Sequence, residues 1–252
     1  MRIASLGSGS RGNATLVEAG GTRVLVDCGF SVRELRRRLA HCGVDADSLD
    51  AVLVTHEHAD HIRGVGALAG RLGIPAWMTH GTARRFQDPD TSQPGLFNGH
   101  ESFLIGDLEV RPYPVPHDAR EPAQFVFKSG DSQLGLLTDV GTITPHIVDS
   151  LDSCDALILE CNHDPDMLAN GPYPPRLKAR VGGAWGHLSN GQAAELLGRL
   201  DHGRLRRVVA AHLSEKNNTP ALAWEALNAV APTLDGRISV ADQDCPSVWF
   251  EV

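Results

Sequence analysis

The chain has 252 residues, 42% of them hydrophobic, so it is long enough to bury a substantial core. Acidic residues number 31 against 23 lysines and arginines, and the formal charge of -8 excludes a protein that coats nucleic acid through a general positive charge. Five scattered cysteines without a CxxC pair, and no apolar run near the roughly 20 residues that span a bilayer, predict a cytoplasmic protein that is not exported and has neither disulfides nor a membrane segment.

Segments of strand and helix character alternate along the chain and predict a single mixed-sheet α/β domain over residues 1–252. Glycine-containing pairs at 20–21 and 130–131 predict antiparallel hairpins, which favours a mixed-sheet sandwich over a purely parallel sheet. Residues 163–192, rich in glycine and proline, are expected to form a long functional loop. The expected strands are 22–29, 50–56, 124–130, 134–141, 155–162, 205–214 and 247–252, and the expected helices are 31–42, 60–72, 193–200 and 223–230.

The stretch "THEHADH" at 55–61 follows one of these strands and concentrates histidines and acids that are costly to bury without a partner. In an extended chain His56 and His58 lie at i and i+2, so both imidazoles point to one side. Asp60 and His61 fall on the following turn, at the start of the expected helix. This arrangement predicts a site for two cations roughly 3.5–4 Å apart, completed by ligands from elsewhere in the chain.

Other expected strands also end in residues that bind metals. His117, Asp139 and His212 are the natural further candidates, and Asp27 and Glu160 occupy equivalent positions. Strand ends at one edge of a sheet are where α/β folds assemble their sites, so residues remote in sequence can converge there. The recurrence of this pattern is a stronger signal than any single histidine.

These motifs resemble the metallo-β-lactamase superfamily in type and in order. "THEHADH" has the HxHxDH signature, and "VPHDA", "LLTDVG" and "AAHLS" follow it as the later motifs do. The resemblance implies a four-layer αββα sandwich. It also implies one metal on His56, His58 and His117, a second on Asp60, His61 and His212, and a bridge through Asp139. These nitrogen and oxygen ligands suit two divalent ions. Zn²⁺ is the first candidate, and the ligand types also admit Mn²⁺ or Fe.

Further stretches narrow the resemblance. "GSGSRGNA", "LECNHD", "NGPYP", "GHLSN" and "HLSEKNN" look like the YycJ (WalJ, VicX) type of single-domain bacterial metallo-hydrolase, a branch linked to nuclease and DNA-metabolism roles. By this resemblance Ser10 and Asn13 line the rim of the active site. A metal-bridging hydroxide would attack the phosphodiester in line, and Asp60 would orient it.

Residues left over after the ligand assignment have expected supporting roles. Asp27 and Glu160 are expected to accept hydrogen bonds from the ligand imidazoles. His187 either donates the proton to the leaving alkoxide or holds the 163–192 loop, and His163 is expected to play the structural role. The residues expected to meet substrate phosphates are Arg176, Lys178, Arg180, Asn217 and Asn218, with a solvated loop as the alternative.

The chemistry therefore favours a metal-dependent phosphodiesterase, specifically a DNA or RNA exonuclease. The enzymatic alternative is a small-molecule hydrolase that acts on a cyclic phosphodiester, a lactone or a thioester at the same dinuclear site. A regulatory module without turnover is disfavoured because all seven candidate ligands are present. The expected partners are nucleic acid or a small phosphodiester, and no membrane. The sequence does not specify the oligomeric state.

Overall fold

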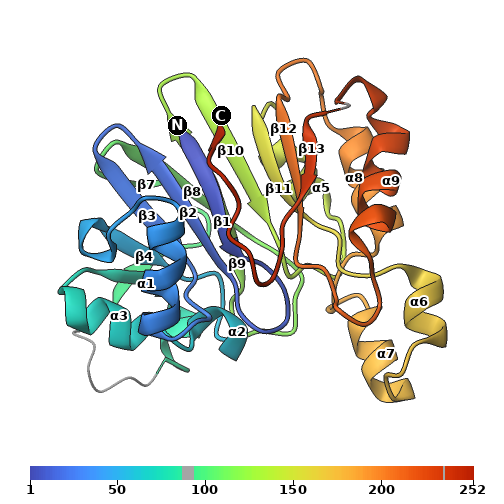
Figure 1. Cartoon of the computed structure of the whole chain (residues 1–252), viewed down its shortest axis with the longest axis horizontal. Coiled ribbons are helices and arrows are strands. Elements are labelled where there is room, and N and C mark those ends of the chain that lie inside the picture. Colours follow the sequence, from blue (N-terminus) through green and yellow to red (C-terminus); the bar gives the residue numbers. More distant parts are fainter. Residues whose placement is uncertain (87–93, 235) are drawn as a thin grey trace.

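The computed structural model describes residues 1–86, 94–234 and 236–252, whose strands form two seven-stranded mixed sheets (Figure 1). The first sheet runs in the order β14 (Phe250–Glu251), β1 (Arg2–Gly7), β2 (Ala14–Ala19), β3 (Thr22–Val26), β4 (Ala51–Leu53), β5 (Ala76–Thr79) and β6 (Gly95–Phe97). The second runs in the order β13 (Ile238–Val240), β12 (Arg207–Ala211), β11 (Ala156–Glu160), β10 (Ser132–Leu137), β9 (Ala123–Ser129), β8 (Leu108–Pro114) and β7 (Phe103–Ile105).

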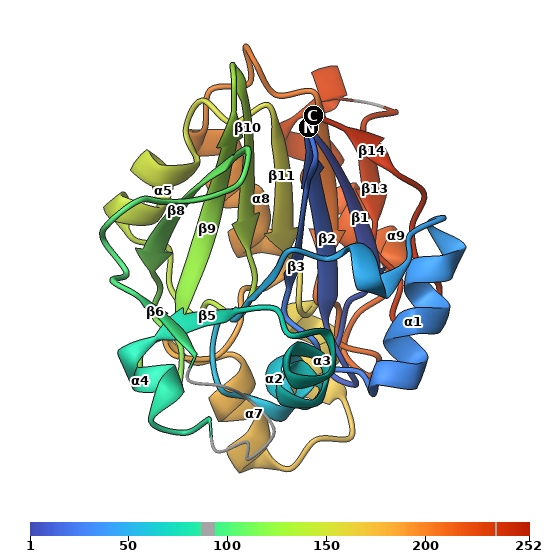
Figure 2. The same cartoon turned by 90° about the vertical axis from the view of Figure 1, so that its left-hand side faces the viewer.

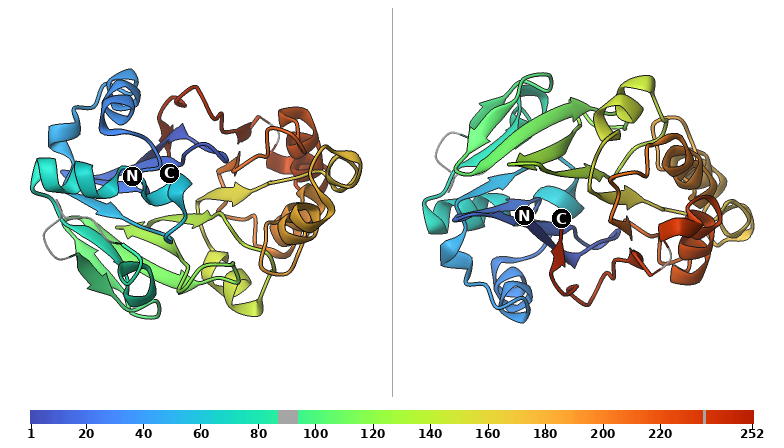
Figure 3. Two further views of the ribbon diagram at one scale, coloured as in Figure 1. Left: turned by 90° about the horizontal axis from the view of Figure 1, so that it is seen from below. Right: turned by 90° about the horizontal axis from the view of Figure 1, so that it is seen from above.

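Helices cover the outer faces of both sheets, and Figure 3 shows the two groups on opposite flanks. The first sheet carries α1 (Val32–His41) and α3 (Val65–Leu72), and the second carries α5 (Pro145–Leu151), α8 (Asn190–Arg199) and α9 (Pro220–Val230). Shorter elements are α2 (Ala59–Ile62), α4 (His80–Ala83), α6 (Pro165–Asn170), α7 (Pro175–Val181), η1 (Ala46–Ser48) and η2 (Pro232–Leu234). This αββα layering confirms the predicted fold class.

Three apolar clusters hold the layers together. Phe125 and Phe127 belong to the cluster between the sheets, Leu35 and Leu39 attach α1 to the first sheet, and Leu196 attaches α8 to the second. All are buried, so each layer contributes apolar area removed from water. Every residue of β11 is buried, because its sheet lies between the other sheet and a layer of helices.

Both predicted hairpins are present, as β2 with β3 and β9 with β10. The predicted helix 60–72 is instead two helices, because Gly64 interrupts it and donates its N–H to Cys28 O at 2.8 Å. A side chain at Gly64 would collide with Phe30 O, so this close approach requires glycine. The 163–192 segment is not a bare loop, since it contains α6 and α7.

The carboxyl ends of the central strands meet at one end of the sandwich. Figure 2 shows α2, α3 and α7 gathered there, away from the two termini. The residues that follow these strands therefore lie near α2 and α7, two short helices from different halves of the chain. No helix among the described residues is long and apolar enough to cross a bilayer.

Candidate metal centre

Three imidazoles converge at the ends of β4 and β8. His56 Nε2 lies 3.0 Å from His58 Nδ1, and His117 Nε2 lies 3.3 Å from the same atom. His56 and His117 are buried, whereas the His58 side chain is 28% exposed and lines the adjoining pocket. Three ring nitrogens at such separations surround a position that suits one cation.

A second group lies beside the first and is built from α2 and the end of β12. His61 Nε2 is 3.4 Å from Asp60 Oδ2, and His212 Nε2 is 3.7 Å from the same oxygen. Asp139, which follows β10, stands between the groups: its Oδ1 lies 3.9 Å from His117 Nε2 and 3.5 Å from His212 Nε2. Its Oδ2 lies 3.3 Å from His61 Nε2. The structure thus brings together all seven residues of the predicted ligand set.

Asp27 fixes the orientation of two of these imidazoles. Its Oδ2 accepts from the Thr55 hydroxyl at 2.8 Å and pairs with His61 Nδ1 at 2.8 Å. Because the Thr55 hydroxyl proton is used on Asp27, Thr55 Oγ1 must accept from His56 Nδ1, 3.0 Å away. Both rings therefore carry a proton on Nδ1 and direct Nε2 toward the site.

Glu160, the last residue of β11, supports the other half of the site from beneath. The carboxylate is fully buried. Both of its oxygens accept hydrogen bonds from N–H groups of the protein. Burial alone would raise the pKa of the Glu160 carboxyl, but the imidazoles of His187 and His212 lower it to about 2. Oε1 accepts from Asp139 N (3.0 Å), His187 Nδ1 (2.9 Å) and His212 Nδ1 (2.9 Å), and Oε2 accepts from Val140 N (3.1 Å) and Leu188 N (3.0 Å).

Three non-glycine residues of this region have left-handed backbone conformations. Asp27, Asp139 and His212 have φ angles of 61°, 55° and 56°. Asp27 and His212 immediately follow β3 and β12, and Asp139 is the second residue after the end of β10. The conformation is unfavourable for residues with a Cβ, so the surroundings must stabilise it. Hydrogen bonds do so here: Asp27 N donates to Leu53 O at 2.8 Å, and His212 N donates to Ser8 Oγ at 2.8 Å.

The chemistry of the donor set fits bound cations. Asp139 Oδ2 and His212 Nε2 are buried without a hydrogen-bond partner, which is costly unless another group satisfies them. Burial alone would lower the pKa of the His212 imidazole, yet the carboxylates of Asp139, Asp60 and Glu160 raise it to about 10. Burial lowers the pKa of His56 and of His117, which favours the neutral form that binds metals. The carboxylates thus favour positive charge, whether a proton or a metal ion, beside the neutral imidazoles of His56 and His117.

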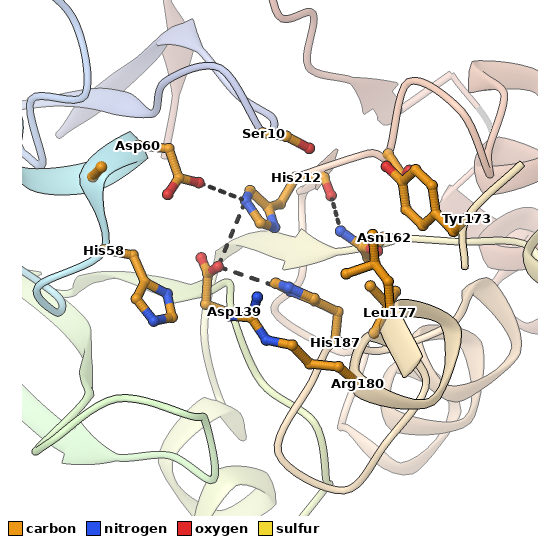
Figure 4. Close-up of a pocket in the computed structure, with 13 residues that line it drawn as sticks. Ser10, His58, Asp60, Asp139, Asn162, Tyr173, Leu177, Arg180, His187 and His212 are labelled. Carbon is orange, nitrogen blue, oxygen red and sulfur yellow. Dashed lines mark hydrogen bonds and ion pairs between the residues drawn. The ribbon is translucent and has the colours of Figure 1, made fainter. Parts of the chain in front are cut away.

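A cavity of about 350 Å³ opens onto this cluster (Figure 4). Ser10, His187 and Arg180 line it together with the exposed parts of the ligand set. The His187 ring is held by Glu160, while its backbone N–H donates to Val181 O at 2.8 Å. Arg180 Nε lies 2.6 Å from Asp118 Oδ2, which ties α7 to the loop that carries His117.

Several residues predicted to contact substrate lie elsewhere. Asn217 and Asn218 are buried, and their side-chain amides donate to Ser214 Oγ and Cys161 O. The prediction that they contact substrate phosphates is therefore wrong, because both make hydrogen bonds inside the protein. Neither is exposed enough to reach a phosphate. Among the 163–192 cations only Arg180 lines the cavity.

Lys178 and Arg176 do not line the cavity. Lys178 Nζ donates to Ala169 O at 2.6 Å and so joins α7 to α6, and Arg176 is exposed on α7. Asn13 is buried behind the ligands, where its Nδ2 lies 3.1 Å from His61 Nε2, instead of on the rim. His163 is buried outside the cavity lining, and burial lowers its pKa. Its Nδ1 is buried without a hydrogen-bond partner among the described residues, so the structural role expected for His163 stays a prediction.

The sequence interpretation missed three residues of this site. Asp118 Oδ1 lies 3.4 Å from His117 Nε2 and 3.7 Å from His58 Nε2, so it faces the first imidazole group. The Thr55 hydroxyl bonds to both Asp27 and His56 and so helps to orient the His56 ring. Tyr173 lines the cavity. Asp118 and Thr55 adjoin the motif histidines in sequence, which was the available signal for both. Tyr173 lies in the "NGPYP" stretch that carries the family resemblance, and the folded chain shows that it lines the cavity.

Comparison with known proteins agrees with this geometry. A family model described as a beta-lactamase superfamily domain matches residues 22–213, which include every candidate ligand. The chain belongs to the beta-lactamase superfamily. It is 35% identical over 224 residues to the exodeoxyribonuclease WalJ of Streptococcus pneumoniae, covering 86% of this chain and 83% of the relative.

Two further similarities cover nearly the whole chain. The exodeoxyribonuclease YycJ of Bacillus anthracis is 31% identical over 234 residues, which are 91% of this chain and 89% of that protein. The crystal structure of the metallo-beta-lactamase fold protein YhfI from Bacillus subtilis superposes with a TM-score of 0.75 at 17% identity, covering 98% of each chain. The first relationship confirms the predicted branch of the superfamily, and the second confirms the fold.

Proposed function

We propose that this member of the beta-lactamase superfamily is a metal-dependent phosphodiesterase that removes nucleotides from nucleic-acid ends. The observation that carries the proposal is the convergence of the seven ligand residues on one open cavity, with Asp139 placed between two ligand groups. The WalJ and YycJ relatives, named as exodeoxyribonucleases, support this substrate class. A hydrolase is the enzyme class that both observations favour.

Two divalent cations fit the donor set, one on the triad of His56, His58 and His117 and the other on Asp60, His61 and His212. When bound, they would supply an acidified water as nucleophile and neutralise charge on the phosphate oxygens. Zinc suits the imidazole-rich first group, and manganese or iron suits the mixed oxygen and nitrogen ligands equally. The chain's own residues must then position the substrate and move the protons.

Asp60 and His187 occupy the positions from which protons can be handled. The Asp60 side chain is 24% exposed and faces both the cavity and His212, so it can orient an attacking water as well as bind metal. His187 is held through Nδ1 by Glu160, which leaves Nε2 as the atom that can donate a proton to the leaving oxygen. The backbone of residue 187 already holds the loop, so the loop does not need the imidazole for this purpose.

Arg180 is the cation best placed to receive a substrate phosphate. Its guanidinium lines the cavity and is paired with Asp118, whose carboxylate also faces His58 and His117. A bound phosphate would offer Arg180 a second anionic partner, and charge-assisted hydrogen bonds of this kind are strong. Exposure of 58% for the Arg180 side chain leaves it free to reorient.

We also propose that the chain is a single domain and that it resides in the cytoplasm. The two sheets share one apolar cluster, which supports a single domain over residues 1–252. All five cysteines are unpaired thiols, in keeping with the reducing cytoplasm that we propose as the protein's location.

A parallel assay of three substrate classes tests the function. Protein reconstituted with zinc or manganese is given labelled DNA and RNA oligonucleotides, bis-p-nitrophenyl phosphate, and a lactone and thioester panel. Shortening of an oligonucleotide from its ends, together with cleavage of the small diester, supports the proposal. Turnover of a lactone or thioester, with neither phosphodiester cleaved, replaces it with the small-molecule alternative.

A further inference from the structure

One wall of the cavity differs in chemistry from the rest. Tyr173, Leu177 and Val181 line it with an aromatic ring and two aliphatic side chains, all within or next to α7. Figure 4 places Tyr173 and Leu177 across the cavity from His58 and Asp60. If the ligand cluster holds the phosphate, a different part of the substrate must contact this apolar wall. The wall therefore indicates a flat, uncharged substrate group near the phosphate.

The segment that carries Tyr173 is held firmly in place. Tyr173 lies in "GPYPP", where prolines fix the backbone on both sides of it. Asn217 O accepts from Asp164 N at 2.8 Å at the start of α6, and Gly171 passes too close to the Asn217 side chain to tolerate a Cβ. The buried Asn217 thus contacts the chain at both ends of α6, next to the loop on which the ring stands. A ring positioned in this way before the substrate arrives loses little freedom on binding.

We propose that Tyr173 stacks on the terminal base of the substrate, so that the enzyme selects nucleic-acid ends whose last base is unpaired. This inference rests on the proposed function. A base inside a duplex is already stacked and paired, and it can reach the Tyr173 ring only after leaving the helix. Every base has a flat face, so the contact accepts all four bases and adds affinity without reading sequence. The cavity volume of about 350 Å³ suits one such group beside the phosphate.

The test compares a single-stranded oligonucleotide with the same oligonucleotide lacking the base of both terminal residues. The full-length protein, reconstituted with manganese, is assayed for the KM of each. Wild type should show a KM about tenfold or more higher for the abasic oligonucleotide, the range expected from loss of one aromatic stacking contact. Tyr173→Leu keeps an apolar side chain without the ring and should bring the two KM values close together.

Two control variants isolate the ring. Tyr173→Phe retains it and should keep the discrimination. Trp185→Leu removes a different ring, which is 63% exposed and does not line the cavity, and it should also keep the discrimination. Circular dichroism checks that each variant is folded.

The outcomes separate this inference from the function on which it rests. Efficient cleavage of both oligonucleotides by wild type with equal KM values would overturn the stacking role and leave the nuclease intact. Persistence of the discrimination in folded Tyr173→Leu would do the same. Failure of wild type to cleave any oligonucleotide would overturn the proposed function first, and this inference with it.

Discussion

Glu160→Gln is the substitution that most sharply tests how the candidate site is supported. The wild-type carboxylate accepts five hydrogen bonds, three on Oε1 and two on Oε2. A glutamine of the same shape has one oxygen and one NH₂ group. If its oxygen keeps the three donors of Oε1, its NH₂ group faces the N–H groups of Val140 and Leu188, which cannot accept a hydrogen bond.

The size of the effect follows from these contacts. A buried donor left without an acceptor costs ~1–3 kcal/mol, so two such donors lower the free energy of unfolding by ~2–6 kcal/mol. This is a large part of the ~5–15 kcal/mol that stabilises a typical domain. The lost negative charge also weakens the orientation of His212, and we expect metal affinity to fall about 10- to 100-fold.

Asp155→Asn is the matched control because Asp155 lies just before the same strand, at its opposite end. It is buried and accepts from Gln133 N at 2.9 Å, far from the candidate ligands along β11. Urea unfolding should show both variants destabilised, whereas competition with a chelator should show weaker metal binding in Glu160→Gln alone. Equal metal affinity in Glu160→Gln and wild type would refute the supporting role assigned to this carboxylate.

Three further predictions concern the same site. His58→Ala should reduce hydrolysis below detection yet leave the unfolding midpoint of the metal-free protein nearly unchanged, because the side chain is partly exposed; an active variant with bound metal would contradict the ligand assignment. Chelation should lower the Tm of wild type, and zinc or manganese should restore it, because a ligand of the folded state stabilises that state; a Tm that ignores the chelator would count against the metal centre. Arg180→Ala should reduce the salt slope of single-stranded DNA binding by about 0.7, whereas Lys178→Ala, whose ammonium group bonds to Ala169 O, should leave it unchanged. Equal slopes for wild type and Arg180→Ala would remove Arg180 as a phosphate contact.

Local pattern predicted a mixed-sheet sandwich and the convergence of strand-ending residues, whereas the αββα layering and the division of the ligands into two groups came from the family resemblance. Strand-ending residues such as Asp139 and His212 meet because parallel strands place their carboxyl ends at one edge of a sheet. The same reasoning brought Asp27 and Glu160 to the site, where each pairs with a ligand imidazole. Periodicity also located α1, since Leu35 and Leu39 repeat at helical spacing and are buried.

The features that were missed depend on contacts between distant segments. Asn217 looked like a phosphate contact because it follows His212, yet it is buried and its backbone O accepts from Asp164 N at the start of α6. Lys178 and Arg180 lie on one short helix, and only the packing of α7 decides which of them reaches the cavity. The break at Gly64 is likewise imposed by the approach of the Cys28 backbone. Composition and periodicity contain no information about such contacts.

The metal content of the purified chain tests the central claim most directly. The account predicts close to two equivalents of transition metal per chain by elemental analysis, after gentle purification or after dialysis against Zn²⁺ or Mn²⁺. Asp139→Ala should hold clearly less, because that carboxylate stands between the two ligand groups. Less than half an equivalent in wild type, with none taken up on dialysis, would contradict the two-metal site and the phosphodiesterase built on it.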